Sequence, residues 1–174
     1  NKSKKIYLED AQYYIEDIRK SVIETFTYDK VYKQGLNINT PINLELQKIA
    51  TETLREGLIS YDKRKGWRGA LTNKKYNKNW KDNLKKFNLE KSINWQLAIV
   101  KKINKFSVNI ETEDKLEGKI EFQNISWIKK EFNKFLKLGD IIYVKKIEGD
   151  KYSLMQLPKV NGGIVVMDPY TGRV

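Results

Sequence analysis

The spacing of apolar residues changes from helical to strictly alternating near Trp95, and this change constrains the fold more than any other feature. After it, the pattern predicts three strands, a short helix and two more strands, which is the order of the five-stranded Greek-key barrel that binds oligonucleotides and oligosaccharides, the OB fold. An open five-stranded sheet is the alternative. The expected elements are strands at 95–99, 106–110 and 116–122, a helix at 125–136, and strands at 140–147 and 151–157.

The alternation also predicts one core inside the barrel, since every second side chain of a strand faces the same side. Glu148-Gly149-Asp150 is expected to be the tight hairpin between the last two strands. The side chains predicted to share the core are Phe106, Val108, Ile110, Ile120, Phe122, Val144 and Leu154.

The first part of the chain has helical periodicity with one interruption. Residues 7–26 predict an amphipathic helix that ends near Phe26, and the alternation over 35–40 predicts a short strand. Asn43 is expected to cap a second helix, whose apolar face carries Leu46 and Ile49 inward. The predicted fold class is therefore α+β, a small OB-like barrel inserted in a helical linker with short strands.

Residues 72–91 predict a basic interdomain linker in which aromatic residues alternate with lysines. Tyr76, Trp80, Leu84 and Phe87 fall on one helical face. Such a stripe can bind a membrane surface, an anionic glycan or single-stranded nucleic acid. Packing of a short helix on a neighbouring domain is the preferred interpretation.

The last residues predict a strand at 164–167, a turn at 168–172 and the start of a second strand. Because this hairpin would lack its return strand, we expect the natural protein to continue. The two ends of an inserted domain generally lie close together. We therefore expect residues 35–40 and 163–168 to pair in one small sheet or to pack against the same helix.

Composition narrows the chemistry. The chain has no histidine and no cysteine, which removes the usual general base, thiol catalysis and cysteine zinc sites. No apolar run is long enough to span a membrane. The net charge of +12 would suit a polyanion, but only five of the 34 basic residues are arginine, so a generic basic surface is favoured over specific phosphate recognition.

Three stretches together resemble the class A penicillin-binding proteins, type 1a branch, between the glycosyltransferase and transpeptidase domains. The first is similar to that family's G-L-x-x-x-T-T-L-D-P-x-L-Q segment, although it carries Asn39 for the first threonine, one additional residue, and Asn43-Leu44 for Asp-Pro. The second is similar to R-x-G-L…Y-D-x-R-x-G-W-R-G and the third to V-x-G-A-L-V-A-M-D-P-x-T-G-R-V. In this chain the first stretch is residues 35–47, the second is residues 54–69 and the third is residues 160–174.

The resemblance implies a non-catalytic part of a periplasmic, bifunctional peptidoglycan synthase that is anchored in the bacterial inner membrane by a segment outside this chain. It implies that the barrel spaces the two catalytic domains, which are its partners in the same polypeptide. A cell-wall polymer or an outer-membrane lipoprotein activator would be a further partner. The implied division is 1–71, a linker at the base of the transpeptidase domain; 72–91, a basic linker; 92–158, the barrel; and 159–174, the first transpeptidase strands.

The candidate interaction surface contains aromatic residues whose exposure would be costly without a partner. Packing between domains is the default interpretation of its tryptophans. No catalytic, cofactor or metal site is expected. The crowded carboxylates Glu111, Glu113, Asp114 and Glu117 are interpreted as a solvated hairpin tip. The residues chosen for the interaction surface are Trp67, Arg68, Tyr76, Trp80 and Trp127.

Two other functions compete with this interpretation. A free-standing nucleic-acid-binding barrel would need exposed aromatic residues on its second and third strands, but Phe106 and Phe122 are in phase with core residues. A hydrolase would use Ser60 or Ser126 in the pattern S-x-x-K, yet seven serines among so many lysines give about one such match by chance. No K-[ST]-G segment accompanies either serine, so we expect no catalysis by this chain.

Overall fold

The computed structural model describes residues 11–33, 36–76, 79–82, 84–87, 89, 93–128 and 130–172. The chain divides into two compact units, one formed by Leu58–Asn161 and the other by Asn1–Gly57 with Gly162–Val174. We call the first the barrel unit and the second the terminal unit. Within the described ranges, no helix combines the length and the apolarity that crossing a membrane requires.

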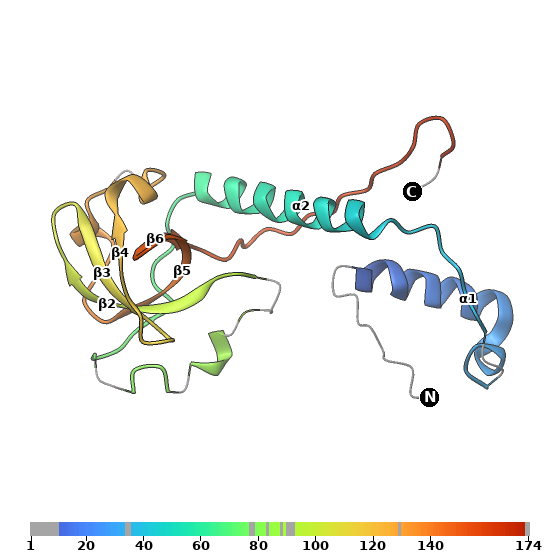
Figure 1. The fold of residues 1–174 in the computed structure, drawn as a ribbon, viewed down its shortest axis with the longest axis horizontal. Coiled ribbons are helices and arrows are strands. Elements are labelled where there is room, and N and C mark those ends of the chain that lie inside the picture. Colours follow the sequence, from blue (N-terminus) through green and yellow to red (C-terminus); the bar gives the residue numbers. More distant parts are fainter. Residues whose placement is uncertain are drawn as a thin grey trace. The chain divides into compact units, whose positions relative to one another are not determined.

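The barrel unit contains a six-stranded sheet in the order β1-β5-β2-β3-β4-β6 (Figure 1). Neighbouring strands are antiparallel except β4 and β6, which pair in parallel, and the additional pairing of β5 with β6 closes the sheet. This connectivity confirms the predicted OB-like barrel and the α+β class. The strands are β1 (Thr72–Asn73), β2 (Gln96–Ile103), β3 (Ser107–Thr112), β4 (Glu117–Glu121), β5 (Asp140–Glu148) and β6 (Lys151–Met155).

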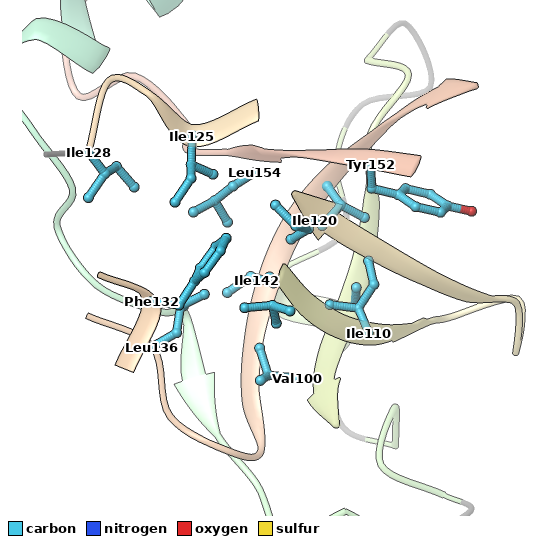
Figure 2. Close-up of a cluster of buried hydrophobic side chains, with 13 residues drawn as sticks. Val100, Ile110, Ile120, Ile125, Ile128, Phe132, Leu136, Ile142, Tyr152 and Leu154 are labelled. Atoms are coloured by element: carbon cyan, nitrogen blue, oxygen red, sulfur yellow. The ribbon is translucent and has the colours of Figure 1, made fainter. Parts of the chain in front are cut away.

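The barrel interior is filled by apolar side chains from alternate strand positions, Tyr152 of β6 among them, together with residues of the β4–β5 connection (Figure 2). Of the predicted core, Val108, Ile110, Ile120, Val144 and Leu154 are buried as expected. The β5–β6 turn at Gly149, with φ 54°, confirms the expected hairpin and uses the conformational freedom of glycine.

Two members of the predicted core were assigned wrongly. Phe106 is 69% exposed and Phe122 is 42% exposed. Phe106 precedes β3, in the loop after β2, and Phe122 follows β4 at the start of a 3-10 helix. Both continue the alternation of their strands, but they lie beyond the layer of side chains that fills the barrel.

The central strands are buried on both faces, which simple alternation did not predict. Leu97 and Ile99 of β2 pack with Ile141 and Tyr143 of β5 in a second apolar cluster outside the barrel. Four residues supply the cover of this cluster, since Trp80 and Leu84 belong to it and Phe87 and Leu89 pack against it.

Two predicted helices in the barrel unit are wrong. The β4–β5 connection forms two short 3-10 helices, η3 (Phe122–Ile125) and η4 (Phe132–Lys134), although Ile125, Phe132 and Leu136 are buried as their spacing suggested. The aromatic-basic segment holds β1, turns and the 3-10 helix η2 (Lys85–Phe87) among its described residues. Packing against the sheet overrides helical periodicity in both segments.

The terminal unit contains helix α1 (Gln12–Lys33), which is kinked at Thr27, and most of helix α2 (Leu44–Arg64). The kink, where φ is 67°, follows the predicted helix end at Phe26. The Asn43 cap is confirmed, because its Oδ1 accepts bonds from the backbone nitrogens of Glu45 at 3.0 Å and Leu46 at 3.1 Å.

The predicted pairing of the two chain ends is not found. Residues 36–40 and 164–167 form no strand, and the inward face expected of α2 is wrong at Leu46 and Ile49, which are exposed. The turn after residue 167 is confirmed, since the backbone nitrogen of Gly172 donates to the carbonyl oxygen of Asp168 at 2.9 Å. Gly35, Arg173 and Val174, which belong to the same expectation, lie outside the described residues.

Candidate functional site

Asp62, in the last turn of α2, ties the segment that enters the barrel to the segment that leaves it. Its Oδ1 accepts bonds from the Arg68 guanidinium at 2.6 Å and from the backbone nitrogen of Lys159 at 3.2 Å. Its Oδ2 accepts a bond from Nε2 of Gln156 at 2.8 Å. The Asp62 side chain is 3% exposed, so these donors replace water around a buried carboxylate.

The loop between α2 and β1 is shaped to bring Arg68 to this carboxylate. Gly66 and Gly69 have φ of 90° and 105°, a conformation that other residues rarely adopt. Gln156 also links the two segments, because its Oε1 accepts from the backbone nitrogen of Arg68 at 2.8 Å and its Nε2 donates to the carbonyl of Gly66 at 3.1 Å. We call Asp62, Arg68, Gln156 and Lys159 the neck.

Burial alone would raise the pKa of Asp62. The hydrogen bonds from Arg68, Gln156 and Lys159 outweigh that penalty and hold the pKa below its ordinary value of 3.8. The neck therefore stabilises the fold in the ionised state, above the pKa of the unfolded chain, and this stabilisation is lost as the pH falls through the folded pKa.

An aromatic cluster lies beside the neck. The ring centroid of Trp67 is 6.2 Å from that of Trp127 and 6.3 Å from that of Phe135, both in edge contacts. Lys63 places its Nζ 5.6 Å from the Trp127 ring centroid and 4.0 Å from Sδ of Met155. Burial, with a smaller effect of Lys145, lowers the pKa of Lys63.

The same contacts explain why the match to S-x-x-K at residues 60 and 63 is not a catalytic pair. The amine of Lys63 faces Trp127 and Met155, while Oγ of Ser60 accepts a bond from Arg64 at 3.4 Å. A serine nucleophile needs a base within hydrogen-bond reach. For the match at Ser126, the lysine at 129 lies outside the described residues.

Glu111 forms a second centre of contacts. Its carboxylate accepts bonds from the Tyr76 hydroxyl at 2.7 Å and from the Trp80 indole nitrogen at 2.9 Å, and Nζ of Lys101 lies at 3.4 Å. Burial is the largest single effect on the pKa of Glu111 and raises it. The donors Tyr76, Trp80 and Lys101 together outweigh burial and hold this pKa below its ordinary value. Glu111 therefore fastens the cover of the second cluster to β3, and its assignment to a solvated hairpin tip was wrong.

The five residues chosen from the sequence fall into two groups. Trp67, Arg68 and Trp127 belong to the neck and its aromatic cluster, whereas Tyr76 and Trp80 meet at Glu111. Trp80 is 2% exposed, so its ring supports the fold and cannot be part of a free surface. Sequence reasoning missed Asp62, Glu111 and Gln156 as centres of contact, although Asp62 stood in one of the motifs.

The barrel region matches a known protein family. The family model described as the penicillin-binding protein OB-like domain matches residues 67–160, which begin at the neck and run through the whole barrel. The chain belongs to this family. The match covers the sheet, both 3-10 helices of the β4–β5 connection and the exit segment, so this region is an OB-like domain and not a catalytic domain.

Relatives with this domain are similar along nearly the whole chain. Penicillin-binding protein 1A of Rickettsia bellii is 36% identical over 169 residues, which cover 94% of this chain and 21% of that protein. The Rickettsia prowazekii protein of the same name is 35% identical over the same coverage. The chain thus spans about a fifth of the length of these curated relatives. The resemblance to the type 1a branch is confirmed.

A crystal structure of penicillin-binding protein 1A from Haemophilus influenzae shares the fold. It superposes with a TM-score of 0.63 over 85% of this chain and 22% of that chain, at 23% sequence identity. Family membership does not favour the alternative of a free-standing nucleic-acid-binding protein. The exposure of Phe106 and Phe122, however, removes the argument from their phase with the core, whereas the acidic residues near these strands still count against this alternative.

Proposed function

We propose that this chain is the non-catalytic linker and OB-like segment of a bifunctional peptidoglycan synthase. Its glycosyltransferase and transpeptidase domains would lie elsewhere in the same periplasmic polypeptide, which another segment anchors in the inner membrane. The barrel spaces these domains and offers a surface to a regulatory partner, either cell-wall polymer or an outer-membrane lipoprotein activator. The division at residues 71, 91 and 158 is part of this proposal.

The observation that supports a spacing role is the neck. Asp62 binds the side chain of Arg68, on the segment that enters the barrel, and groups of Gln156 and Lys159, on the segment that leaves it. The two connections of the barrel therefore meet at one buried carboxylate. A spacer transmits a defined geometry only if its connections are fixed. Hydrogen bonds from three donors, two of them on the exit segment, supply that constraint.

The candidate interaction surface stays a prediction, and its accessible members are Trp67, Arg68, Tyr76 and Trp127. Trp67 and Trp127 are only partly buried, and Tyr76 is exposed. Arg68 is already engaged by Asp62, so a partner at this surface would meet a guanidinium whose orientation is fixed.

The spacing role is tested in the full-length gene product by replacing residues 70–156 with a short Gly-Ser linker. We expect acylation of the transpeptidase serine by a fluorescent β-lactam to remain, because that chemistry lies outside this chain. Cross-linking of newly polymerised glycan should fall, since the two domains lose their fixed geometry. Unchanged cross-linking together with unchanged acylation would refute the spacing role. The control variant is Arg64→Ala, which removes an exposed side chain of α2.

A further inference from the structure

Helix α1 contains a backbone conformation that its sequence does not explain. At Thr27, where the helix is kinked, φ is 67° and ψ is 154°. This conformation is almost restricted to glycine, and a β-branched residue such as threonine is strained in it. Sharp kinks in helices usually occur at proline or glycine, but residues 12–33 contain neither. The kink is therefore held by contacts beyond the local backbone.

A hydrogen bond joins the two sides of the kink. Nη1 of Arg19 donates to the hydroxyl oxygen of Tyr32 at 3.2 Å, although 13 residues separate them in sequence. In a straight helix this separation advances about 20 Å along the axis, which is further than the two side chains can bridge. The bond can therefore form only when the helix is kinked. We call this hydrogen bond between Arg19 and Tyr32 the latch.

The other contacts of the two latch residues do not require the kink. Arg19 also binds the carboxylate of Glu16 through two hydrogen bonds, of 2.6 and 2.7 Å. The ring centroid of Tyr32 lies 4.4 Å from that of Tyr28. Side chains three or four residues apart are neighbours on any α-helix, so both contacts would persist in a straight one. Of these contacts, only the latch favours the kink.

Two opposing effects therefore decide the shape of α1. Straightening would relieve the strain at Thr27, but it would break the latch. The latch is exposed, so water can replace it and its net contribution is small. Strain at one residue is of similar size. When two such effects nearly cancel, both conformations are populated and a small perturbation shifts the balance.

We propose that α1 is a two-state joint, which is kinked and latched in one state and a straight helix from Gln12 to Lys33 in the other. The inference goes beyond the proposed function, because the barrel and its neck hold one geometry, whereas α1 would give the preceding segment two lengths. A straight helix of 22 residues is about 33 Å long, and a kinked one has a shorter end-to-end distance.

The two states are measured by the distance between two spin labels in pulsed electron paramagnetic resonance of the 174-residue chain. The labels are attached at Gln12→Cys and Lys30→Cys, which are exposed positions. The chain has no cysteine of its own, so no other position is labelled. In a straight helix these positions lie on one face, about 27 Å apart. We expect this distance from the straight state and a shorter one from the kinked state.

Two variants should shift the balance in opposite directions. Tyr32→Phe keeps the ring beside Tyr28 but removes the hydroxyl, so the ratio of straight to kinked chains should rise about fivefold. Thr27→Gly should lower the ratio about tenfold, because glycine adopts positive φ at little cost.

Matched controls leave the kink and the latch unchanged. Tyr13→Phe removes the hydroxyl of a tyrosine that is 96% exposed, and Lys20→Gly places a glycine at an exposed position that is helical in both states. Neither should alter the ratio more than about twofold. Labels at Gln12→Cys and Glu24→Cys, both before Thr27, should give one distance of about 18 Å in every variant.

Several results would overturn the inference. A single distance in the unaltered chain that also persists in Tyr32→Phe and Thr27→Gly would show that α1 has one state. An equal response to Thr27→Gly and Lys20→Gly would show a general weakening of the helix instead of a joint at Thr27. None of these results bears on cross-linking by the full-length protein, so the spacing role of the barrel would stand or fall separately.

Discussion

Removal of Arg68 and removal of Asp62, the two charged side chains that pair in the neck, should lower the free energy of unfolding by different amounts. Arg68→Ala leaves the Asp62 carboxylate, which is 3% exposed in the unaltered chain, with only neutral donors from Gln156 and Lys159. Loss of one partner from a buried ion pair costs about 3–5 kcal/mol, because the remaining charge is not compensated. Asp62→Ala instead leaves a guanidinium that is 28% exposed and can be hydrated. It should cost roughly 2–3 kcal/mol for the lost charged hydrogen bonds.

The measurement is the free energy of unfolding in urea at neutral pH, followed by tryptophan fluorescence. All four tryptophans lie within the barrel unit, so the signal reports that unit. The double variant should cost less than the sum of the single variants, because the pair interacts directly. Arg64→Ala, which removes an exposed arginine of α2, should change stability by no more than about 0.5 kcal/mol.

Unfolding at acidic pH distinguishes an uncompensated charge on Asp62 from a simple loss of packing in Arg68→Ala. Since the folded pKa of Asp62 lies below 3.8, the neck contributes fully above that pH and less as the pH falls through the folded pKa. In Arg68→Ala, only Gln156 and Lys159 still oppose the effect of burial, so the folded pKa of Asp62 should rise and protonation should relieve part of the penalty. The difference in the free energy of unfolding between Arg68→Ala and the unaltered chain should therefore narrow as the pH falls toward the folded pKa of Asp62. A constant difference, or a larger cost for Asp62→Ala than for Arg68→Ala, would refute the reasoning.

Three further outcomes follow from the contacts of single residues, the first two measured by the same urea titration. Phe122→Ala should cost only about 1 kcal/mol, because the ring is 42% exposed, whereas Ile120→Ala, which is fully buried, should cost about 2–5 kcal/mol; equal costs would contradict this. Glu111→Ala should cost about 1–3 kcal/mol, because the Tyr76 and Trp80 donors lose their acceptor, and no loss would contradict the fastening role. The isolated chain should form no covalent β-lactam adduct in mass spectrometry; stoichiometric labelling at Ser60 would contradict the non-catalytic assignment.

Much of the barrel could be predicted because its signals are local. Alternation identified the strands and most core positions, and the hairpin at Glu148-Gly149-Asp150 and the cap at Asn43 depend on residues next to each other in sequence. The errors at Phe106 and Phe122 have a common cause. Alternation gives the side of a strand but not where the neighbouring layer ends, and both residues lie just past that end.

The centres of contact could not be predicted because their partners are distant in sequence. Gln156 lies 94 residues from Asp62, and Trp80 lies 31 residues from Glu111. A carboxylate that is followed by Glu113 and Asp114 gives no sign in the sequence that a tyrosine and an indole will cover it. The second apolar cluster was missed for a similar reason, since a strand buried on both faces has a continuous apolar run in which one set of alternate residues can be mistaken for the whole core.

The neck and the exposed phenylalanines contribute differently to the stability of the barrel. Phe106 is 69% exposed, so its ring adds less to stability than a buried ring would. Arg68→Ala should therefore lower the free energy of unfolding by several times as much as Phe106→Ala does. Equal losses in a urea titration would show that Phe106 serves the fold after all.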